Sequence, residues 1–179
     1  MPVVVVTDAS ARLPADLAAA NGIRVVPLHV LVDGADLRDG VDDIPLDIHD
    51  RQASTAGATP AELSGAYARA LAASRGDGVL GVHLSAALSS TCSAAEEAAR
   101  QLGDAVAVVD SKSAAMGTGF IALAAARAAA TGADLHTVVD TARAAVGRTH
   151  AYIVVQRLDN LHRRGGHCGS TTGNSFWRS

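Results

Sequence analysis

The sequence predicts a three-layer α/β protein, with a mainly parallel, Rossmann-like sheet flanked by helices. Apolar, β-branched runs alternate with segments of helical periodicity along the chain, and this alternation is typical of repeated strand–helix–strand units. The run Val79–Leu84, in which His83 is the polar interruption, is apolar enough for a strand buried on both faces. Polar clusters directly follow several of the strands, and in such sheets ligands bind beyond the carboxyl ends of the strands.

The first third of the chain starts this alternation. Pro2–Thr7 is a β-branched run, and a helix of about two turns is expected from Pro14 to Asn21. The segment Arg24–Val32 predicts a second strand, which an Asp-Gly turn ends. We interpret Ala35–Asp43 as an acidic loop. Its four aspartates lack the order of an EF-hand, so solvated loop charge is favoured over a calcium site.

The middle of the chain predicts a short helix over Pro45–Gln52 and a longer one after Thr59. Thr59 and Glu62 have the spacing of a capping box, and Pro60 occupies the first helical position. The remaining expected elements are a helix starting at Thr91 and ending at Gly103, a strand at Ala105–Val109, helices at Ala114–Ala130 and Leu135–Val146, a strand at His150–Val155 and a short helix at Leu158–Arg164.

The strongest candidate site follows the strand Val79–Leu84. Hydroxyl side chains crowd the turn between this strand and the next helix; they belong to Ser85, Ser89, Ser90 and Thr91. A helix N-terminus presents free backbone N–H groups and partial positive charge, so it can hold a phosphate or a carboxylate. The simpler alternative is that one serine caps the helix and the rest is loop polarity.

Two more polar clusters follow predicted strands. Asp8 ends the first strand, and Asp110 and Ser111 follow the strand at Ala105–Val109. Because parallel strands end at the same edge of a sheet, we expect Asp8 and Asp110 to lie at the edge that carries Ser85. Three clusters at one edge favour a ligand site over simple loop polarity.

Composition excludes several classes of function. The 179 residues suit one well-cored domain, and 15 basic against 18 acidic residues give a net charge of −3 without a basic stripe, so a nucleic acid partner is not expected. The two cysteines form no disulfide framework or CxxC motif, and there is no signal peptide or long apolar run. A cytoplasmic protein fits these features.

Common catalytic and cofactor motifs are also missing. Gly117-x-Gly119 lies too far past its strand for a dinucleotide fingerprint, and no Walker A sequence occurs. The G-x-S-x-G pattern is absent, so Ser85 or Ser89 as a hydrolase nucleophile would lack its elbow. His162, His167 and Cys168 have no fourth ligand at zinc spacing. We therefore expect no metal and no cofactor.

Taken in order, the motifs resemble the DegV family of bacterial lipid-binding proteins. The matching segments run from Val3 to Gly166 and are Val6–Ser10 with Leu13-Pro14, Val26–Leu28, Asp39–Val41, Thr55–Pro60, Leu84-Ser85 with Leu88–Thr91, Asp110–Lys112, Gly117-x-Gly119, and Leu158-x-x-Leu161 with Gly165-Gly166. The departures from the family pattern are Ala9 for serine, Ala56 and Ala58 in the T-S-Q-P-T-P segment, and Ser90 for glycine.

This resemblance implies a non-enzymatic carrier. Such a protein holds one long-chain fatty acid between two α/β lobes and presents it to a separate ATP-binding fatty acid kinase, and peripheral membrane contact is compatible with that role. The residues implied at the carboxylate are Thr55, Ser85, Ser89, Ser90 and Thr91, with Asp8, Asp110, Ser111 and His167 as supporting residues. We interpret the segment of Thr55 and the segment of Ser89 and Thr91 as loop-to-helix junctions beside the carboxyl edge of the sheet. The three side chains are then expected to converge in one hydrogen-bonding site.

The end of the sequence departs from the family pattern. We expect residues 1–166 to form the N-terminal lobe and residues 167–179, which lack strand or helix periodicity, to form an irregular tail, so that the second lobe is absent and the chain is truncated. An exposed apolar surface beside Ser89 would follow. Two alternatives to the carrier remain open, namely a small α/β enzyme with a serine or phosphate site and an inactive truncated fragment.

Overall fold

The computed structural model describes residues 2–152 of the chain. Its strands are β1 (Val4–Asp8), β2 (Arg24–Val26), β3 (His29–Val32), β4 (Ala35–Arg38), β5 (Ala53–Ala56), β6 (Val79–His83) and β7 (Val106–Asp110). Its helices are α1 (Ala15–Ala20), α2 (Pro60–Ser74), α3 (Thr91–Leu102), α4 (Met116–Ala130) and α5 (Leu135–Val146), with single 3-10 turns η1 (Ala9–Ala11), η2 (Ile48–Asp50) and η3 (Gly103–Ala105).

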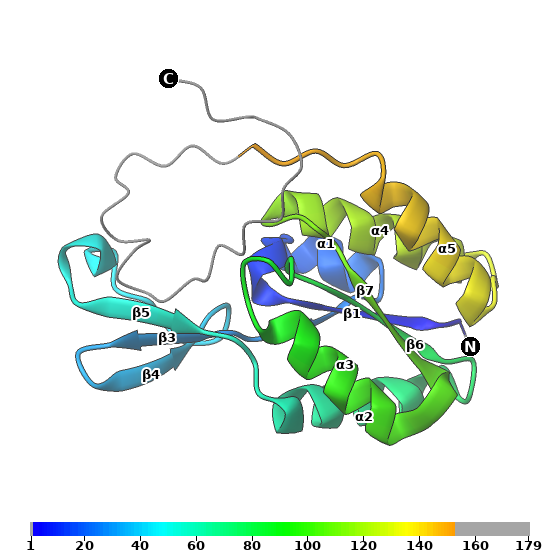
Figure 1. Cartoon of the computed structure of the whole chain (residues 1–179), viewed down its shortest axis with the longest axis horizontal. Coiled ribbons are helices and arrows are strands. Elements are labelled where there is room, and N and C mark those ends of the chain that lie inside the picture. The colour runs from blue at the N-terminus through cyan, green and yellow to red at the C-terminus, as the bar shows by residue number, and fades with distance from the viewer. Residues whose placement is uncertain (1, 153–179) are drawn as a thin grey trace, which may run out of the picture.

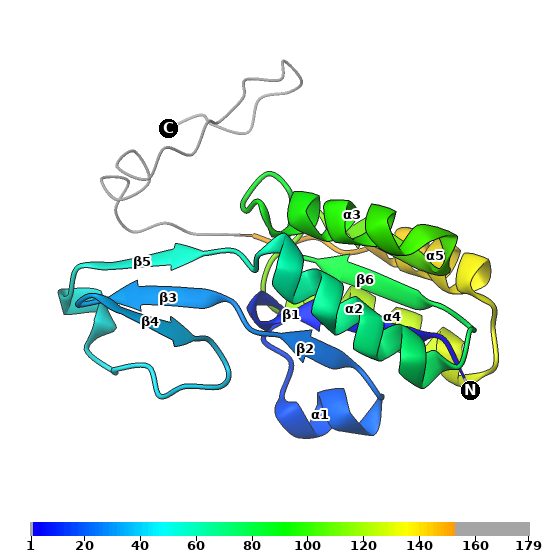
Figure 2. The ribbon, with the colours of Figure 1, turned by 90° about the horizontal axis from the view of Figure 1, so that it is seen from below.

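A parallel sheet forms the middle layer, in the order β2-β1-β6-β7. Helices α2 and α3 cover one face, and α1, α4 and α5 cover the other (Figures 1 and 2). Strand residues alternate between the faces: Val5 and Leu80 pack toward α4, whereas Val6 and Val79 pack toward α2. The predicted three-layer α/β fold is confirmed.

The direction of the connections changes between β1 and β6. From β1 the chain passes through α1 to β2 on one side, and from β6 it passes through α3 to β7 on the other side. Helices α1 and α3 also lie on opposite faces of the sheet. This is a topological switch point, where α/β sheets bind ligands at the carboxyl ends of the strands.

Alanine supplies much of the packing between helices and sheet. The buried alanines of the helices are Ala18 on α1, Ala66 and Ala70 on α2, Ala95, Ala98 and Ala99 on α3, Ala122, Ala125, Ala126 and Ala129 on α4, and Ala142 and Ala145 on α5. Small side chains let the helices approach the sheet closely, so a close-packed core can form with few aromatic residues.

A second sheet projects from this body as an arm, in the antiparallel order β4-β3-β5 (Figure 1). The prediction of one strand over Arg24–Val32 is therefore wrong: β2 belongs to the parallel sheet and β3 to the arm. Pro27 separates the two, because proline has no N–H to donate to a ladder and restricts the residue before it. Val26 is buried in the body, while Leu31 is 40% exposed on the arm.

Three further expectations about this region are corrected. The acidic segment Ala35–Asp43 is not all loop, since β4 occupies its first four residues; positive φ angles at Asp33 and Gly34 form the two-residue turn that closes the β3–β4 hairpin. The helix expected over Pro45–Gln52 is only the 3-10 turn η2. Thr55 lies within β5, opposite Val30, and not at a loop-to-helix junction.

His29 ties the arm to the body. Its Nδ1 lies 2.8 Å from a carboxylate oxygen of Asp36 on β4, and its Nε2 lies 3.1 Å from both carboxylate oxygens of Glu62 on α2. Glu62 also closes the predicted capping box, which is confirmed: it accepts from the Thr59 N–H and hydroxyl and donates its own N–H to the Thr59 hydroxyl. The arm is therefore fixed at the start of α2.

We expect this contact to be pH-dependent. The hydrogen bonds to Asp36 and Glu62 raise the pKa of His29 above its usual value, whereas Thr59 and His29 overcome the effect of burial and lower the pKa of Glu62 to about 2. A histidine with a raised pKa stabilises the fold fully below its unfolded pKa of about 6.5, and this stabilisation is lost as pH rises through the folded value.

The destabilisation caused by His29→Gln should accordingly be larger at pH 6 than at pH 9. Urea unfolding at both pH values measures it, and an NMR titration should give His29 a pKa above 6.5. A destabilisation that grows with pH, or an unshifted titration, would show that the contact does not hold in solution.

The predictions for the C-terminal segment fall mostly outside the described residues. His150–Tyr152, the start of the strand expected at His150–Val155, has no regular secondary structure. The rest of that strand, the helix Leu158–Arg164 and the tail after Gly166 are not described, so the domain boundary at residue 166 stays a prediction. In the described residues no helix is long and apolar enough to span a membrane.

Candidate functional site

The buried carboxylate of Asp8 joins the ends of β1 and β6. One oxygen, Oδ2, accepts hydrogen bonds from His83 Nδ1 and from the Leu84 N–H, both at 3.0 Å. The other, Oδ1, accepts from the N–H and hydroxyl of Ser10. Burial acts to raise the pKa of Asp8, but these donors, with His83 the largest contributor among them, outweigh it and lower the pKa. Asp8 therefore fixes the peptide that leads into Ser85.

His83 extends this network to α2. Its Nε2 lies 2.7 Å from the hydroxyl of Tyr67, and both side chains are fully buried. Burial raises the pKa of Tyr67 far above its usual value, so the hydroxyl keeps its proton and can donate it. His83 is thus a strand residue whose two ring nitrogens both have hydrogen-bond partners.

The turn after β6 is folded back on Ser85. The Ser85 carbonyl oxygen accepts hydrogen bonds from the N–H groups of Leu88 and Ser89, at 2.9 and 3.1 Å. The Ser85 hydroxyl accepts a hydrogen bond from the Ala87 N–H. Leu88 is 57% exposed beside these polar groups. The turn is thus ordered by its own hydrogen bonds and carries one large exposed apolar side chain; the extent of an apolar surface here stays a prediction.

Ser89 and Thr91 meet at the start of α3. Their hydroxyl oxygens lie 2.9 Å apart, and the Ser89 hydroxyl also accepts from the Thr91 N–H, at 3.2 Å. Ser89, and not the adjacent Ser90, therefore bonds the first N–H of α3; the Ser90 side chain makes no capping bond. This arrangement offers hydroxyl groups and free N–H groups together, as an oxyanion site requires.

Gly57 brings the end of the arm against this pair. A Cβ atom on Gly57 would lie 2.6 Å from the Thr91 hydroxyl and 3.4 Å from the Ser89 hydroxyl. The segment that follows Thr55 therefore contacts the α3 N-terminus through Gly57. Thr55 itself is exposed on β5 two residues earlier, and its convergence with Ser89 and Thr91 stays a prediction.

Asp110 and Ser111 lie at the neighbouring strand end. Because β1, β6 and β7 are all parallel, Asp8, Asp110 and Ser85 share one edge of the sheet, as predicted. Asp110 accepts from the N–H groups of Ala86 and Lys112, so its carboxylate helps to hold the Ser85 turn. Ser111 is buried and bonds to Thr118 on α4. His167 lies outside the described residues.

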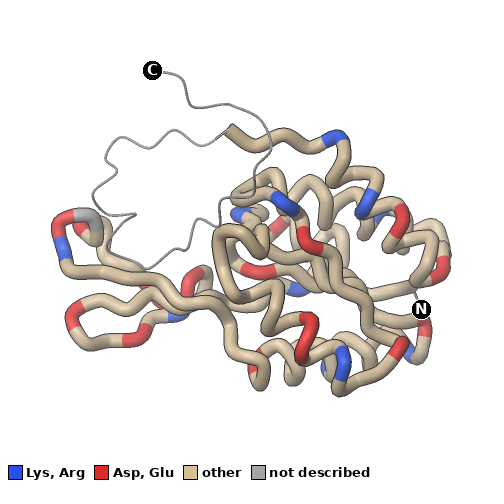
Figure 3. The backbone as a smooth tube through the Cα atoms, in the orientation of Figure 1, with Lys and Arg blue, Asp and Glu red and all other residues tan. Residues whose placement is uncertain are grey.

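Other groups at this edge have no catalytic arrangement. Burial raises the pKa of the Cys92 thiol to about 12, so it is not a nucleophile at neutral pH. Within the described residues no three His, Cys, Asp or Glu side chains gather as metal ligands. Acidic and basic residues are interspersed over the described chain (Figure 3).

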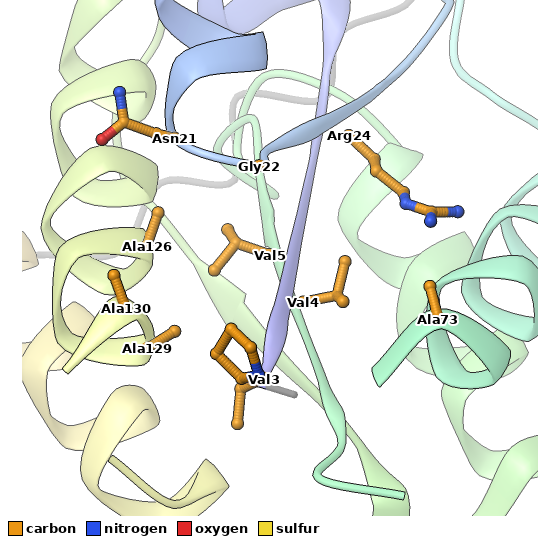
Figure 4. Close-up of a pocket in the computed structure, with 11 residues that line it drawn as sticks. Val3, Val4, Val5, Asn21, Gly22, Arg24, Ala73, Ala126, Ala129 and Ala130 are labelled. Carbon is orange, nitrogen blue, oxygen red and sulfur yellow. The ribbon is translucent and has the colours of Figure 1, made fainter. Parts of the chain in front are cut away.

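A separate hollow lies at the opposite, amino-terminal edge of the sheet. Its volume is about 250 Å³, and its lining includes Val3, Val5, Ala126 and Ala130, with Arg24 at one side (Figure 4). It is mostly apolar, and it lies away from the hydroxyl groups described above because it surrounds the start of β1 and the end of α4.

Comparison with known proteins identifies the family. A family model described as "Uncharacterised protein, DegV family" matches residues 2–173. The chain belongs to the DegV family. A DegV domain-containing protein of Mycobacterium tuberculosis is 66% identical over 165 residues, which are 92% of this chain and 59% of that protein. One of Corynebacterium glutamicum is 39% identical over 166 residues, 92% of this chain and 55% of the relative.

Solved DegV structures share the fold. A Thermus thermophilus DegV protein, described as fatty-acid-binding, has a TM-score of 0.76 at 33% sequence identity. The match covers 82% of this chain and 54% of the Thermus thermophilus chain. The Bacillus subtilis DegV, described as a fatty acid binding protein, has a TM-score of 0.71 at 27% sequence identity. The match covers 80% of this chain and 53% of the Bacillus subtilis chain. This chain spans between half and three fifths of the length of these relatives.

Proposed function

We propose that the chain binds a long-chain fatty acid, with the carboxylate at the Ser/Thr turns of this edge. The observation that carries the proposal is the pairing of the Ser89 and Thr91 hydroxyls at the N-terminus of α3, at the switch point of the sheet. Two DegV proteins of 27% and 33% identity are described as fatty-acid-binding, and they support the ligand class. Thr55, Ser85 and Ser90 are proposed to complete the site.

The chemistry of this turn suits a carboxylate. Each hydrogen bond from a hydroxyl or an N–H to a charged oxygen contributes about 1.5 to 3 kcal/mol. The nearby carboxylates compete little for the same donors, because Asp8 and Asp110 are each bonded to backbone N–H groups of the turn region. Tail burial adds about 0.8 kcal/mol per methylene, about 12 kcal/mol gross for a chain of fifteen, before ordering costs.

An enzyme with a serine nucleophile is the less favoured alternative. Such a serine needs a base within hydrogen-bond reach. His83 has both ring nitrogens occupied, by Asp8 and Tyr67, and within the described residues neither Ser85 nor Ser89 is hydrogen-bonded to a histidine or a carboxylate. The arrangement therefore supports binding over acyl transfer.

We also propose that the bound fatty acid is presented to a separate ATP-binding kinase, with Asp8, Asp110, Ser111 and His167 supporting the site. The exposed position of the turn, with Leu88 more than half exposed, supports access by a partner. This part of the proposal rests on the resemblance of the motifs to the family.

Mass spectrometry of lipid extracted from the purified protein tests the proposed ligand. A fatty acid should co-purify in near-equimolar amount. Protein that stays empty after expression and after incubation with long-chain fatty acids would reject the carrier function and leave the enzyme and the inactive fragment as the remaining candidates.

Gly57→Ala should weaken fatty acid binding, because its Cβ would overlap the Thr91 hydroxyl and push the start of α3 away. Since a contact of 2.6 Å cannot be kept, we expect a loss of roughly tenfold in affinity, equivalent to one hydrogen bond to a charged group. Gly40→Ala is the control for backbone effects: Gly40 also lies in the arm region but has open space around it, and its φ of +83° makes the substitution at least as strained. Equal affinities for wild type and Gly57→Ala would contradict the placement of the site.

A further inference from the structure

A buried hydroxyl without a partner lies in the segment that leads into α4. Ser113 is 4% exposed, and its hydroxyl oxygen has no hydrogen-bond partner in the described part of the chain. Folded proteins pair nearly all such groups, because leaving a buried hydroxyl unpaired costs free energy. The partner of this hydroxyl is therefore a group outside the described residues, either a water molecule or a ligand.

The hydroxyl of Ser113 points at the first turn of α4. A Cβ atom on Gly117, the second residue of α4, would lie only 2.0 Å from the Ser113 oxygen. A side chain at position 117 would overlap the Ser113 hydroxyl. Glycine at this position therefore allows the hydroxyl to lie against the first turn of α4.

The N-terminus of α4 is otherwise uncapped. Ala115 occupies the N-cap position and has no side chain that could accept a hydrogen bond. The N–H groups of Gly117 and Gly119 bond to the carbonyls of Ala114 and Ala115; within residues 2–152 no partner is found for the N–H groups of Met116 and Thr118. This fifteen-residue helix therefore presents free donors and the positive end of its dipole beside the Ser113 hydroxyl.

Two charged residues, Lys112 and Asp110, precede this helix end in the sequence. The ammonium group of Lys112 is one residue from Ser113 and exposed, so it can approach a bound anion. Asp110 is the nearest acidic residue in the sequence, and it is bonded to the N–H groups of Ala86 and Lys112. The Ser113 carbonyl accepts from the Ser85 N–H at 3.0 Å, so this helix end adjoins the Ser85 turn.

We propose that the N-terminus of α4 is a second oxyanion site, which binds a phosphate group through the Ser113 hydroxyl, the free N–H groups of the first turn and Lys112. A tetrahedral oxyanion has enough acceptor oxygens for all of these donors together. The site lies at the start of α4, which covers the other face of the sheet from α3 and its Ser89–Thr91 pair, and the proposal does not depend on lipid binding.

Thermal unfolding in inorganic phosphate tests the proposal, against sodium chloride of equal ionic strength. With phosphate at ten times its dissociation constant, the midpoint of the wild type should rise by roughly 3 °C. Ser113→Ala should lose most of this rise while remaining at least as stable without phosphate, because it removes an unpaired buried hydroxyl. Lys112→Gln should lose part of it. Ser64→Ala, on α2 at the other face of the sheet, is the control and should keep the full rise.

Three outcomes would overturn the proposal. The wild type could show no rise beyond the chloride reference, or Ser113→Ala could keep the full rise, in which case Ser113 holds only a water molecule. The rise could also disappear in Ser89→Ala and persist in Ser113→Ala, which would place the phosphate at α3. None of these outcomes requires lipid binding, so failure here is distinguishable from failure of the fatty acid proposal.

Discussion

Asp8→Ala is expected to lower the free energy of unfolding by about 3 to 5 kcal/mol, the largest effect on stability that we predict. The substitution leaves four groups without their acceptor: the ring N–H of His83, the N–H of Leu84, and the N–H and hydroxyl of Ser10. His83 is fully buried, so its ring cannot recover the lost bond from water. The same change releases the peptide that leads into the Ser85 turn.

Urea unfolding followed by circular dichroism measures this loss. Asp140→Ala is the matched control, because Asp140 also pairs with basic groups, His136 and Arg143, but its side chain is 53% exposed; exposed pairs contribute about 1 kcal/mol or less. Losses of similar size in the two variants would show that the network at Asp8 does not hold the sheet edge.

The contribution of Asp8 also has a predicted pH dependence. Because its folded pKa is lowered, the stabilisation is present above the unfolded value of about 3.8 and is lost as pH falls through the folded value. The difference in stability between wild type and Asp8→Ala should accordingly shrink below pH 4.

The double variant Ser89→Ala/Thr91→Val is expected to weaken fatty acid binding by roughly tenfold to a hundredfold. One of the two hydroxyls donates to the other, so the change removes one free hydroxyl donor to the carboxylate, about 1.5 to 3 kcal/mol, together with the hydroxyl that orients it. Valine matches the shape of the buried Thr91, so the start of α3 should keep its packing. The free N–H groups of the helix remain, and binding should therefore be weakened without being abolished.

Isothermal titration with a long-chain fatty acid below its micelle concentration measures this change. Ser93→Ala is the control, since Ser93 lies on the same helix, two residues after Thr91, and its side chain is exposed. A double variant that binds as tightly as Ser93→Ala would show that the carboxylate is held elsewhere.

Local sequence patterns predicted the parts of the fold that local interactions determine. The capping box at Thr59 and Glu62 places the start of α2 correctly, and the apolar run Val79–Leu84 places β6 within one residue. The strands β4 and β5 of the arm were missed because each has only four residues, most of which are exposed. The β-branched run from Arg24 to Val32 continues across two sheets, and only Pro27 marks the change.

The site was predictable to a similar extent. The turn from Ser85 to Thr91 is contiguous, so its hydroxyl-rich sequence before a helix is visible locally. The supporting contacts join distant positions: Asp8 and His83 are 75 residues apart, and Gly57 meets Thr91 across the arm. No periodicity encodes such pairs. Gly57 falls within the T-A-G-A-T-P segment, but its contact with α3 follows only from the fold.

Comparison of a long-chain fatty acid with its methyl ester, by titration against the wild-type chain, tests the central claim most directly. The two ligands share the apolar tail, and the ester lacks the charged carboxylate that Ser89, Thr91 and the start of α3 are proposed to bind. We predict one-to-one binding of the acid and at least tenfold weaker binding of the ester. Equal affinities, or no binding of the acid, would contradict a carboxylate site at this edge of the sheet.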